Sequence, residues 1–183
     1  GELYYYYFDQ KVPLKERQDL AFIKFCDSQS KDSFVARIDG GLSTLRPYSP
    51  SGDKEQVSGR AGDMLLVQSS SPEEIDGLIK ELKADPSVVF VSKALEYEGS
   101  LVGVSDEFSV KLRKGTSQTE LERLAAKFGC AVFQREFFGK DIFFIKVDKM
   151  SEFGVLKLAN SFYETGLFEF TSPDFYIFNA FSI

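Results

Sequence analysis

The sequence predicts an α+β fold with two β-α-β-β-α-β units in tandem, each an antiparallel sheet with helices on one face. Three observations support this prediction. Strand and helix patterns alternate in that order in the second half of the chain, and a weaker version of the same order occupies the first half. Matched positions also recur about 80 residues apart, as Ser71 and Ser151 do. The order is that of the ferredoxin-like split βαβ fold, so we expect domains over 1–100 and 101–183.

The first elements of the second half are a strand and a capped helix. Residues 108–112 alternate apolar and polar side chains, as a strand with one buried face does. Ser117 and Glu120 have the spacing of a capping box, so a helix is expected to begin here. Its apolar stripe and its end are predicted at Leu121, Leu124, Ala125, Phe128 and Gly129.

A hairpin, a second helix and a last strand complete this half. Residues 130–137 and 141–147 are predicted to be two strands joined by a turn that contains Gly139. A helix is predicted over 151–166, where an N-terminal Ser151 cap precedes an apolar stripe and a glycine ends it. The stripe consists of Val155, Leu156, Ala159, Phe162 and Tyr163. The final strand then extends to residue 178.

The first half repeats these elements in the same order. Strands are predicted over 20–25, 63–68 and 88–97, and a short helix over 30–38. The helix over 71–85 has the clearest signals. Its start combines an N-cap, a proline in the first helical position and a carboxylate that completes a capping box, which are Ser71, Pro72 and Glu74. Its apolar stripe contains Ile75, Leu78, Ile79 and Leu82.

Three segments do not fit the repeat. Residues 4–7 are four tyrosines, predicted to be an extra strand, and residues 11–18 are predicted to be a turn that leads to the first core strand. Residues 45–62 are rich in Gly, Ser, Pro and charge and are expected to be an irregular loop in place of a compact second strand and hairpin turn. Residues 98–107 are too short for an obvious linker, so the two units either pack side by side or share a sheet.

Composition excludes several classes of site. The net charge of −6 argues against nucleic acid and against anionic membrane surfaces. A chain without histidine cannot build a Ser-His-Asp or Cys-His nucleophilic site, or a histidine metal site. Cys26 and Cys130 make neither a disulfide framework nor a CxxC motif and are expected to be unpaired. No apolar run is long enough for a transmembrane helix, so we expect no membrane span. From the composition and the motifs together, we expect no catalytic, cofactor-binding or metal-binding residues.

The strands of the second half carry apolar residues on both faces. In the strand over 141–147, Phe143 and Ile145 alternate with Ile142 and Phe144, and the last strand also has apolar residues at both parities. Helices on one face of such a sheet leave the other face open. An exposed apolar sheet face usually binds a partner, which here is either the other repeat or another domain.

A family resemblance is carried by residues 120–147 and 156–177. These read ELERLAAKFGCAVFQREFFGKDIFFIKV and LKLANSFYETGLFEFTSPDFYI, and the most telling pattern covers Leu158 to Phe175. The segment resembles the N-terminal propeptide region of subtilisin-like serine proteases, of the long secreted bacterial type that includes the fervidolysin-like prodomains. The resemblance covers about residues 105–178 and is looser over 1–100.

The resemblance implies a ferredoxin-like, non-catalytic domain that helps a protease domain to fold and then inhibits it. The sheet face would pack on two helices of the protease through a docking set from the second unit, and the following residues would enter the active-site cleft. The docking set is Phe133, Phe143, Ile145, Phe168, Phe170, Asp174 and Phe175, and the cleft-directed tail is Asn179, Ala180, Phe181, Ser182 and Ile183.

The parent protein would be secreted or extracytoplasmic, with its signal peptide removed and its catalytic domain in cis, downstream of residue 183. The loop over 45–62 is the expected site of proteolytic nicking. Two alternatives stay open. One is a free-standing extracytoplasmic protein–protein interaction module, and the other is a small enzyme, which would require a pocket with clustered Arg, Lys or carboxylates.

Overall fold

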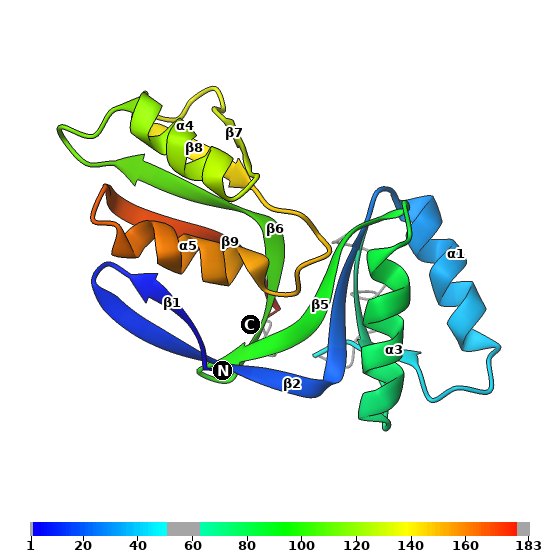
Figure 1. Cartoon of the computed structure of the whole chain (residues 1–183). Coiled ribbons are helices and arrows are strands. Elements are labelled where there is room, and N and C mark those ends of the chain that lie inside the picture. Colours follow the sequence, from blue (N-terminus) through cyan, green and yellow to red (C-terminus); the bar gives the residue numbers. More distant parts are fainter. Residues whose placement is uncertain (1, 51–62, 179–183) are drawn as a thin grey trace. The chain divides into compact units, whose positions relative to one another are not determined.

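The computed structural model describes residues 2–50 and 63–178, and within them the chain is α+β, with a mostly antiparallel sheet and four helices (Figure 1). The predicted fold class is confirmed at this level. Contacts divide the chain into two compact units. Unit 1 is Gly1–Leu14 with Val104–Phe175, and unit 2 is Lys15–Gly103 with Tyr176–Ile183.

This division differs from the expected boundary at residue 100, because segments distant in sequence pair with each other. The first strand, β1 (Leu3–Tyr7), forms a hairpin with the start of β2 (Gln10–Phe25), in which Leu3 lies opposite Leu14. This hairpin packs in unit 1 on a helix about 150 residues further along the chain: the Asn160 side-chain amide donates to the Tyr4 carbonyl oxygen at 2.8 Å. Patterns within a short window carry no information about such a contact.

The described residues of unit 2 include two helices and the strands before, between and after them. After β2 come α1 (Ser28–Asp39), β3 (Arg46–Pro47), β4 (Met64–Gln68), α3 (Pro72–Lys83) and β5 (Val88–Tyr97). The strand order is β5-β2-β4-β3, with neighbours antiparallel. A short second strand, β3, therefore lies where the sequence predicted only an irregular loop. Residues 51–62 of that predicted loop lie outside the described residues.

Two segments that the sequence did not predict to be strands are largely extended. Residues 11–18, predicted to be a turn, belong to the 16-residue strand β2. Pro13 is tolerated there because it lies opposite Tyr4, three pairs from the hydrogen-bonded pair Tyr7–Gln10 that closes the two-residue turn. Hydrogen-bonded and non-hydrogen-bonded pairs alternate, so the ladder with β1 needs no N–H from Pro13. Residues 98–107 contain a two-residue turn, Glu98-Gly99, with φ of 48° and 81°, and then β6 (Ser100–Leu112). Positive φ at both turn positions matches the right-handed twist of the paired strands.

The helices of unit 2 begin at the caps that their sequences provide. The Asp27 carboxylate accepts from the Ser30 amide at 2.7 Å, and the Ser71 hydroxyl accepts from the Glu74 amide. The predicted capping box is wrong in one of its two hydrogen bonds, because the Glu74 side chain does not accept from the Ser71 amide. The Glu74 carboxylate accepts instead from the amide and the hydroxyl of Thr44, at 3.0 and 2.6 Å, which fixes the segment before β3. These hydrogen bonds hold the pKa of Glu74 below its usual value.

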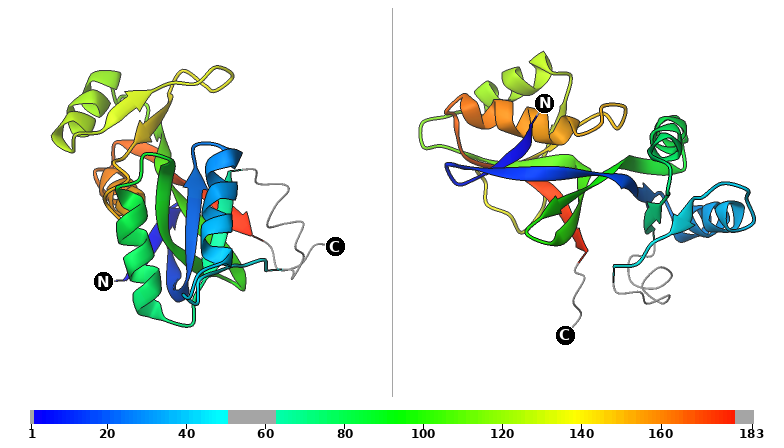
Figure 2. Two further views of the ribbon diagram at one scale, coloured as in Figure 1. Left: turned by 90° about the vertical axis from the view of Figure 1, so that its right-hand side faces the viewer. Right: turned by 90° about the horizontal axis from the view of Figure 1, so that it is seen from below.

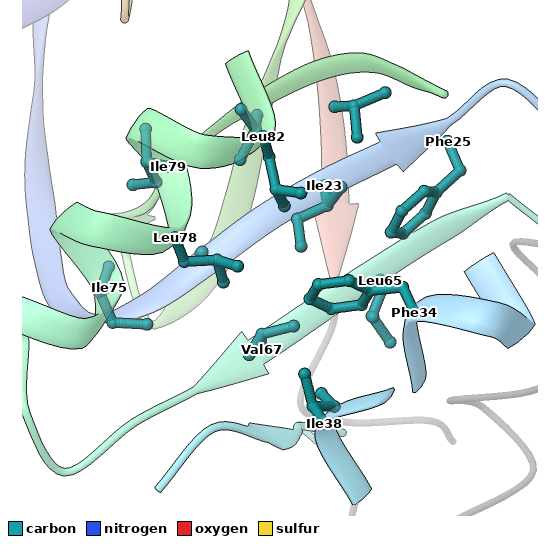
Figure 3. Close-up of a cluster of buried hydrophobic side chains, with 13 residues drawn as sticks. Ile23, Phe25, Phe34, Ile38, Leu65, Val67, Ile75, Leu78, Ile79 and Leu82 are labelled. Carbon is teal, nitrogen blue, oxygen red and sulfur yellow. The ribbon is translucent and has the colours of Figure 1, made fainter. Parts of the chain in front are cut away.

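The core of unit 2 lies between the sheet and its helices. Figure 2 (left) shows α1 and α3 side by side across β2. Alternate residues of β2 point at these helices, and Figure 3 shows the side chains of α3, including the predicted stripe, directed at β2 and β4. The buried members of this cluster are Ala21, Ile23, Phe25, Phe34, Ile38, Leu65, Val67, Ile75, Leu78, Ile79, Leu82, Val88 and Val91.

The other face of the same strands is also apolar and buried. Phe22 points to this face, and its ring lies directly on the backbone of Gly103 at the start of β6. A Cβ atom at position 103 would overlap the ring, so only glycine fits without displacing Phe22. The close approach to Gly103 therefore restricts the orientation of the Phe22 ring on this face of the sheet.

Unit 1 contains the rest of β6 followed by α4 (Gln118–Lys127), β7 (Ala131–Phe133), β8 (Ile142–Lys146), α5 (Gly154–Glu164) and the first part of β9 (Phe168–Phe178), up to Phe175. The strand order is β9-β6-β8-β7. Figure 2 (right) shows α4 and α5 on the same side of β6. The predicted hairpin is confirmed as the antiparallel pair β7–β8, but β7 stops at Phe133 rather than at residue 137. The connecting loop is therefore longer than predicted, and in it Phe137 has a φ of 72°.

The predicted helix caps of unit 1 are confirmed at α4 and corrected at α5. Ser117 and Glu120 form the reciprocal capping box. Ser151 does not cap α5: the helix begins after Phe153, which has a φ of 58° and makes no side-chain cap. Ser151 belongs to a preceding turn, in which its carbonyl oxygen accepts from the Gly154 amide. The matched serines at 71 and 151 therefore have different roles in the two halves.

The core of unit 1 is aromatic. Phe108 of β6 packs edge-on against Phe162 of α5 at 5.2 Å between ring centroids, and Phe162 stacks on Phe168 of β9 at 5.8 Å. All three rings are fully buried. On the outer side of α5, Tyr163 stacks on Tyr6 of β1 at 4.4 Å. Aromatic pairs therefore hold both sides of this helix in place.

Substitution of Gly103 by alanine tests the close approach to Phe22. We expect Gly103→Ala to lower the free energy of unfolding by about 1–3 kcal/mol, because Phe22 must leave its rotamer or the strand must shift. Urea unfolding followed by circular dichroism measures the change. The control is Gly77→Ala in α3, where no atom lies within 4 Å of the added carbon. It should raise stability by about 0.5–1 kcal/mol, and equal effects at both sites would contradict the packing.

The packing of β1 on α5 is tested by the titration of Tyr6. Burial raises the pKa of Tyr6 to about 12, and the hydrogen bond from its hydroxyl to the Glu164 carboxylate, at 3.1 Å, adds to the shift. A pKa above that of the unfolded chain stabilises the fold below pH 10, and this contribution is lost as the pH rises through 12. Absorbance at 295 nm should show a late tyrosinate phase near pH 12 that Tyr6→Phe removes. The phase should persist in Tyr7→Phe, since Tyr7 is exposed.

Candidate docking surface

The face of the unit 1 sheet opposite α4 and α5 carries one aromatic and charged cluster. Strand alternation sends Phe108 and Phe143 to the helices, so their neighbours Ser109 and Phe144 point to the opposite face. The register of β6 and β8 places Ser109 directly opposite Phe144. The register of β7 and β8 places Phe133 on the other side of Phe144. Phe144 is thus the centre of this face.

Three side chains surround the Phe144 ring. Phe133 stacks on it at 5.7 Å between centroids, and Phe138 meets it edge-on at 5.0 Å. The Arg135 guanidinium carbon lies 4.2 Å from the Phe144 centroid and 4.9 Å from that of Phe133, which is cation–π geometry. Phe144 is only 8% exposed as a result, whereas Phe138 is 54% exposed and forms the outer edge of the cluster.

Arg135 also joins this aromatic cluster to β6 by an ion pair. One of its terminal nitrogens lies 2.7 Å from the Glu107 carboxylate, and the Glu107 side chain is only 16% exposed. A carboxylate so poorly exposed needs a cationic partner, because its loss of hydration is otherwise uncompensated. The loop after β7 is therefore tied to the sheet by charge as well as by aromatic packing.

A half-open pocket of about 260 Å³ lies beside this cluster. Its walls combine rings, hydroxyls and charges from β6, the loop after β7, β8 and β9. They are Glu107, Phe108, Ser109, Arg135, Phe138, Phe144, Ser172, Pro173 and Asp174. The Ser109 hydroxyl donates to the Ser172 carbonyl oxygen at 3.5 Å and so links β6 to β9. We call Glu107, Ser109, Phe133, Arg135, Phe138, Phe144, Ser172 and Asp174 the docking surface.

The chemistry of this surface suits recognition of a protein side chain. Aromatic walls with a few oriented polar groups, open to solvent at one edge, are typical of interface pockets that receive an anchor residue. Within residues 2–50 and 63–178, no group of three or more His, Cys, Asp or Glu side chains is arranged to hold a metal ion. In the same part of the chain, no helix has the length and apolar character needed to cross a membrane.

The structure brings two of the predicted docking residues, Phe133 and Asp174, to this surface. It buries three others: Phe143, Ile145 and Phe168 are at most 2% exposed. Their parity along β8 and β9 points them at α4 and α5, so they build the core of unit 1 and cannot contact a partner in this fold. The sequence showed that both faces are apolar but did not show which face the helices cover.

The remaining predicted residues are partly exposed or lie outside the described residues. Phe170 and Phe175 are half-buried, and the Phe175 ring packs edge-on against Tyr5 of β1 at 4.9 Å. The predicted cleft-directed tail, residues 179–183, lies beyond the described part of the chain. The structure therefore leaves the contribution of this tail as a prediction.

Sequence reasoning missed Arg135, Glu107 and Ser109 as parts of the surface. The signal for Ser109 was present, since it alternates with Phe108 in the strand that was predicted over 108–112. Glu107 lies one residue before that predicted strand, and its place in the sheet became visible only with the longer strand β6. No such signal existed for Arg135. It lies in an irregular loop, and its position above Phe144 depends on how that loop folds back over the sheet.

The chain matches no protein-family model, and no curated protein sequence matches it.

A double-mutant cycle tests the link between Arg135 and the sheet. We expect Arg135→Ala to destabilise the fold by about 1–2 kcal/mol, because it leaves Glu107 without its partner and uncovers Phe144. The cycle with Glu107→Gln, followed by urea unfolding, measures the coupling energy.

The matched control is Arg37 on α1, which also pairs with a carboxylate, Glu81, and lies over a ring, that of Phe34. Both charged partners there are more than half exposed, so we expect a coupling below about 0.5 kcal/mol. Equal coupling at the two sites would show that the low exposure of Glu107 has no energetic consequence.

Proposed function

We propose that this chain is a non-catalytic propeptide region of a secreted subtilisin-like serine endopeptidase, acting as an intramolecular chaperone and inhibitor of the catalytic domain. The observation that carries the proposal is the docking surface on unit 1. It combines an exposed aromatic edge at Phe138 with the half-open pocket, on the sheet face that α4 and α5 leave uncovered. The surface is built from the segment that carries the resemblance to such propeptides, about residues 105–178.

The proposed function also implies a particular fold for each unit. We propose that both units are ferredoxin-like, and two observations support this. In each unit the elements follow the order β-α-β-β-α-β, with β6 to β9 in unit 1 and β2 to β5 in unit 2. The strand orders correspond position by position, since β9-β6-β8-β7 matches β5-β2-β4-β3. A gene duplication that produced the two halves accounts for this correspondence.

The physical requirements of the proposed role are met by unit 1. A folding template must be rigid before its partner folds, and the buried aromatic core between the sheet and α5 supplies that rigidity. Docking through Phe133, Phe138 and Asp174 would bury apolar area at the centre of an interface, with Arg135 and Glu107 at its polar rim. In this proposal residues 179–183 enter the active-site cleft of the protease.

An inhibition assay tests the proposal directly. The purified chain is added to a subtilisin-type protease, and initial rates of cleavage of a chromogenic peptide are measured. We expect saturable inhibition with a constant in the range of about 1 nM to 1 µM. Phe138→Ala should weaken inhibition about tenfold or more, because an aromatic anchor is removed from the interface. Leu42→Ala, which removes an exposed apolar side chain from unit 2, is the matched control and should change nothing.

The coding sequence beyond codon 183 decides between the proposal and its alternative. An open reading frame with the Asp, His and Ser motifs of a subtilisin-like catalytic domain is the expected result. A stop codon at that point, together with no inhibition by a correctly folded chain, would reject the propeptide function. The chain would then be a free-standing protein–protein interaction module.

A further inference from the structure

The sheet of unit 2 has a second apolar face, opposite α1 and α3. Six buried side chains of β2, β4, β5 and β6 form it, and we call them the aromatic platform: Leu20, Phe22, Leu66, Phe90, Ala94 and Leu101. Phe22 and Phe90 lie at its centre, with 5.4 Å between their ring centroids. Their exposed fractions are 0% and 4%, although both helices of unit 2 in the described residues pack on the other face. Something else must therefore exclude water from this face.

The end of β9 covers the aromatic platform. The Tyr176 ring stacks on Phe90 at 5.8 Å and lies 5.6 Å from Phe22. The Phe178 ring packs edge-on against Phe22 at 5.2 Å. Ile177, between them, is 65% exposed. The segment thus presents two aromatic side chains to the platform and one residue to solvent, which is the alternation of an extended strand.

A polar contact adds selectivity to this aromatic contact. The Lys24 ammonium lies 3.5 Å from the Tyr176 hydroxyl and 5.7 Å from the centroid of the same ring. Lys24 comes from β2 at the parity of Phe22, so one strand supplies both the ring contact and the contact to the hydroxyl. A tyrosine followed two residues later by an aromatic side chain is the sequence that fits this surface.

We infer that the aromatic platform of unit 2 is an anchoring site for the segment Tyr176–Phe178 and holds the C-terminal end of β9 in place for inhibition of the protease. This inference rests on the proposed function and assigns a role to unit 2 within it. An anchored strand end presents the residues that follow it to the protease at a high effective concentration. A free end would lose conformational entropy on binding, which weakens the affinity. The platform residues are positioning residues, and they act on the protease through the segment.

Two variants and one control test the inference in the full chain. Tyr176→Ala/Phe178→Ala removes the anchored side chains without altering the platform. Phe90→Leu keeps an apolar side chain in the platform but removes the ring that stacks on Tyr176. Ile177→Ala is the matched control, since it changes the same segment at its exposed position. Two readouts are measured for each: amide hydrogen exchange of residues 176–178 by mass spectrometry, and the inhibition constant against a subtilisin-type protease.

We expect exchange at 176–178 to be at least about tenfold faster in both variants, while the control exchanges as the unaltered chain does. The inhibition constant should rise by about tenfold in both variants and stay unchanged in the control, at a temperature at which circular dichroism shows every variant to be folded.

Unchanged exchange in the two variants would overturn the inference, because strand pairing of β9 with β6 alone would then hold the segment. Faster exchange with an unchanged inhibition constant would overturn the link to inhibition. If the unaltered chain does not inhibit at all, the proposed function fails, and the exchange rates still decide whether the platform anchors the segment.

Discussion

The structure depends on the fact that the core strand of unit 2 is apolar on both faces. Every residue from Leu20 to Phe25 is buried except Lys24, which is half-buried. A strand of this kind must be covered on two sides, since either uncovered face would expose large aromatic side chains to water. The helices α1 and α3 cover one side, and Tyr176 and Phe178 cover the other. The chain must therefore bring its C-terminal strand back to residues that it placed near its beginning.

The same requirement appears in unit 1 with a different solution. There, β6 and β8 are also apolar at alternate positions on one face, on which Phe162 of α5 packs against Phe108. The other face is covered only in part, by Arg135 and Phe138 from a loop. This difference separates the two units in function. In the proposed role unit 2 uses its second face within the chain, while unit 1 offers its second face to a partner.

Local signals predicted most of the elements, and tertiary contacts explain the exceptions. The capping box of Ser117 and Glu120 formed as expected because all its atoms lie within one helical turn. The one expected at Glu74 did not, because Thr44 offers that carboxylate two donors from 30 residues away. Lys31 is a similar case. It is 1% exposed on the inner side of α1, and its ammonium has no hydrogen-bond partner among the described residues, which no helical pattern predicts.

The sequence by itself determined the fold class, most of the helices and strands in their order, and the N-caps of α3 and α4. It did so because propensity, capping and alternation act over a few residues. Only the tertiary structure decided which face of each sheet the helices cover. That choice placed Phe143, Ile145 and Phe168 in the core and Phe133 at the surface. The tertiary structure also placed residues 1–14 in the same unit as residues 104–175, which follow about 90 positions later in the sequence. The physical reason is that a period of two puts apolar side chains on both faces of a strand equally well, and only long-range packing makes the two faces different.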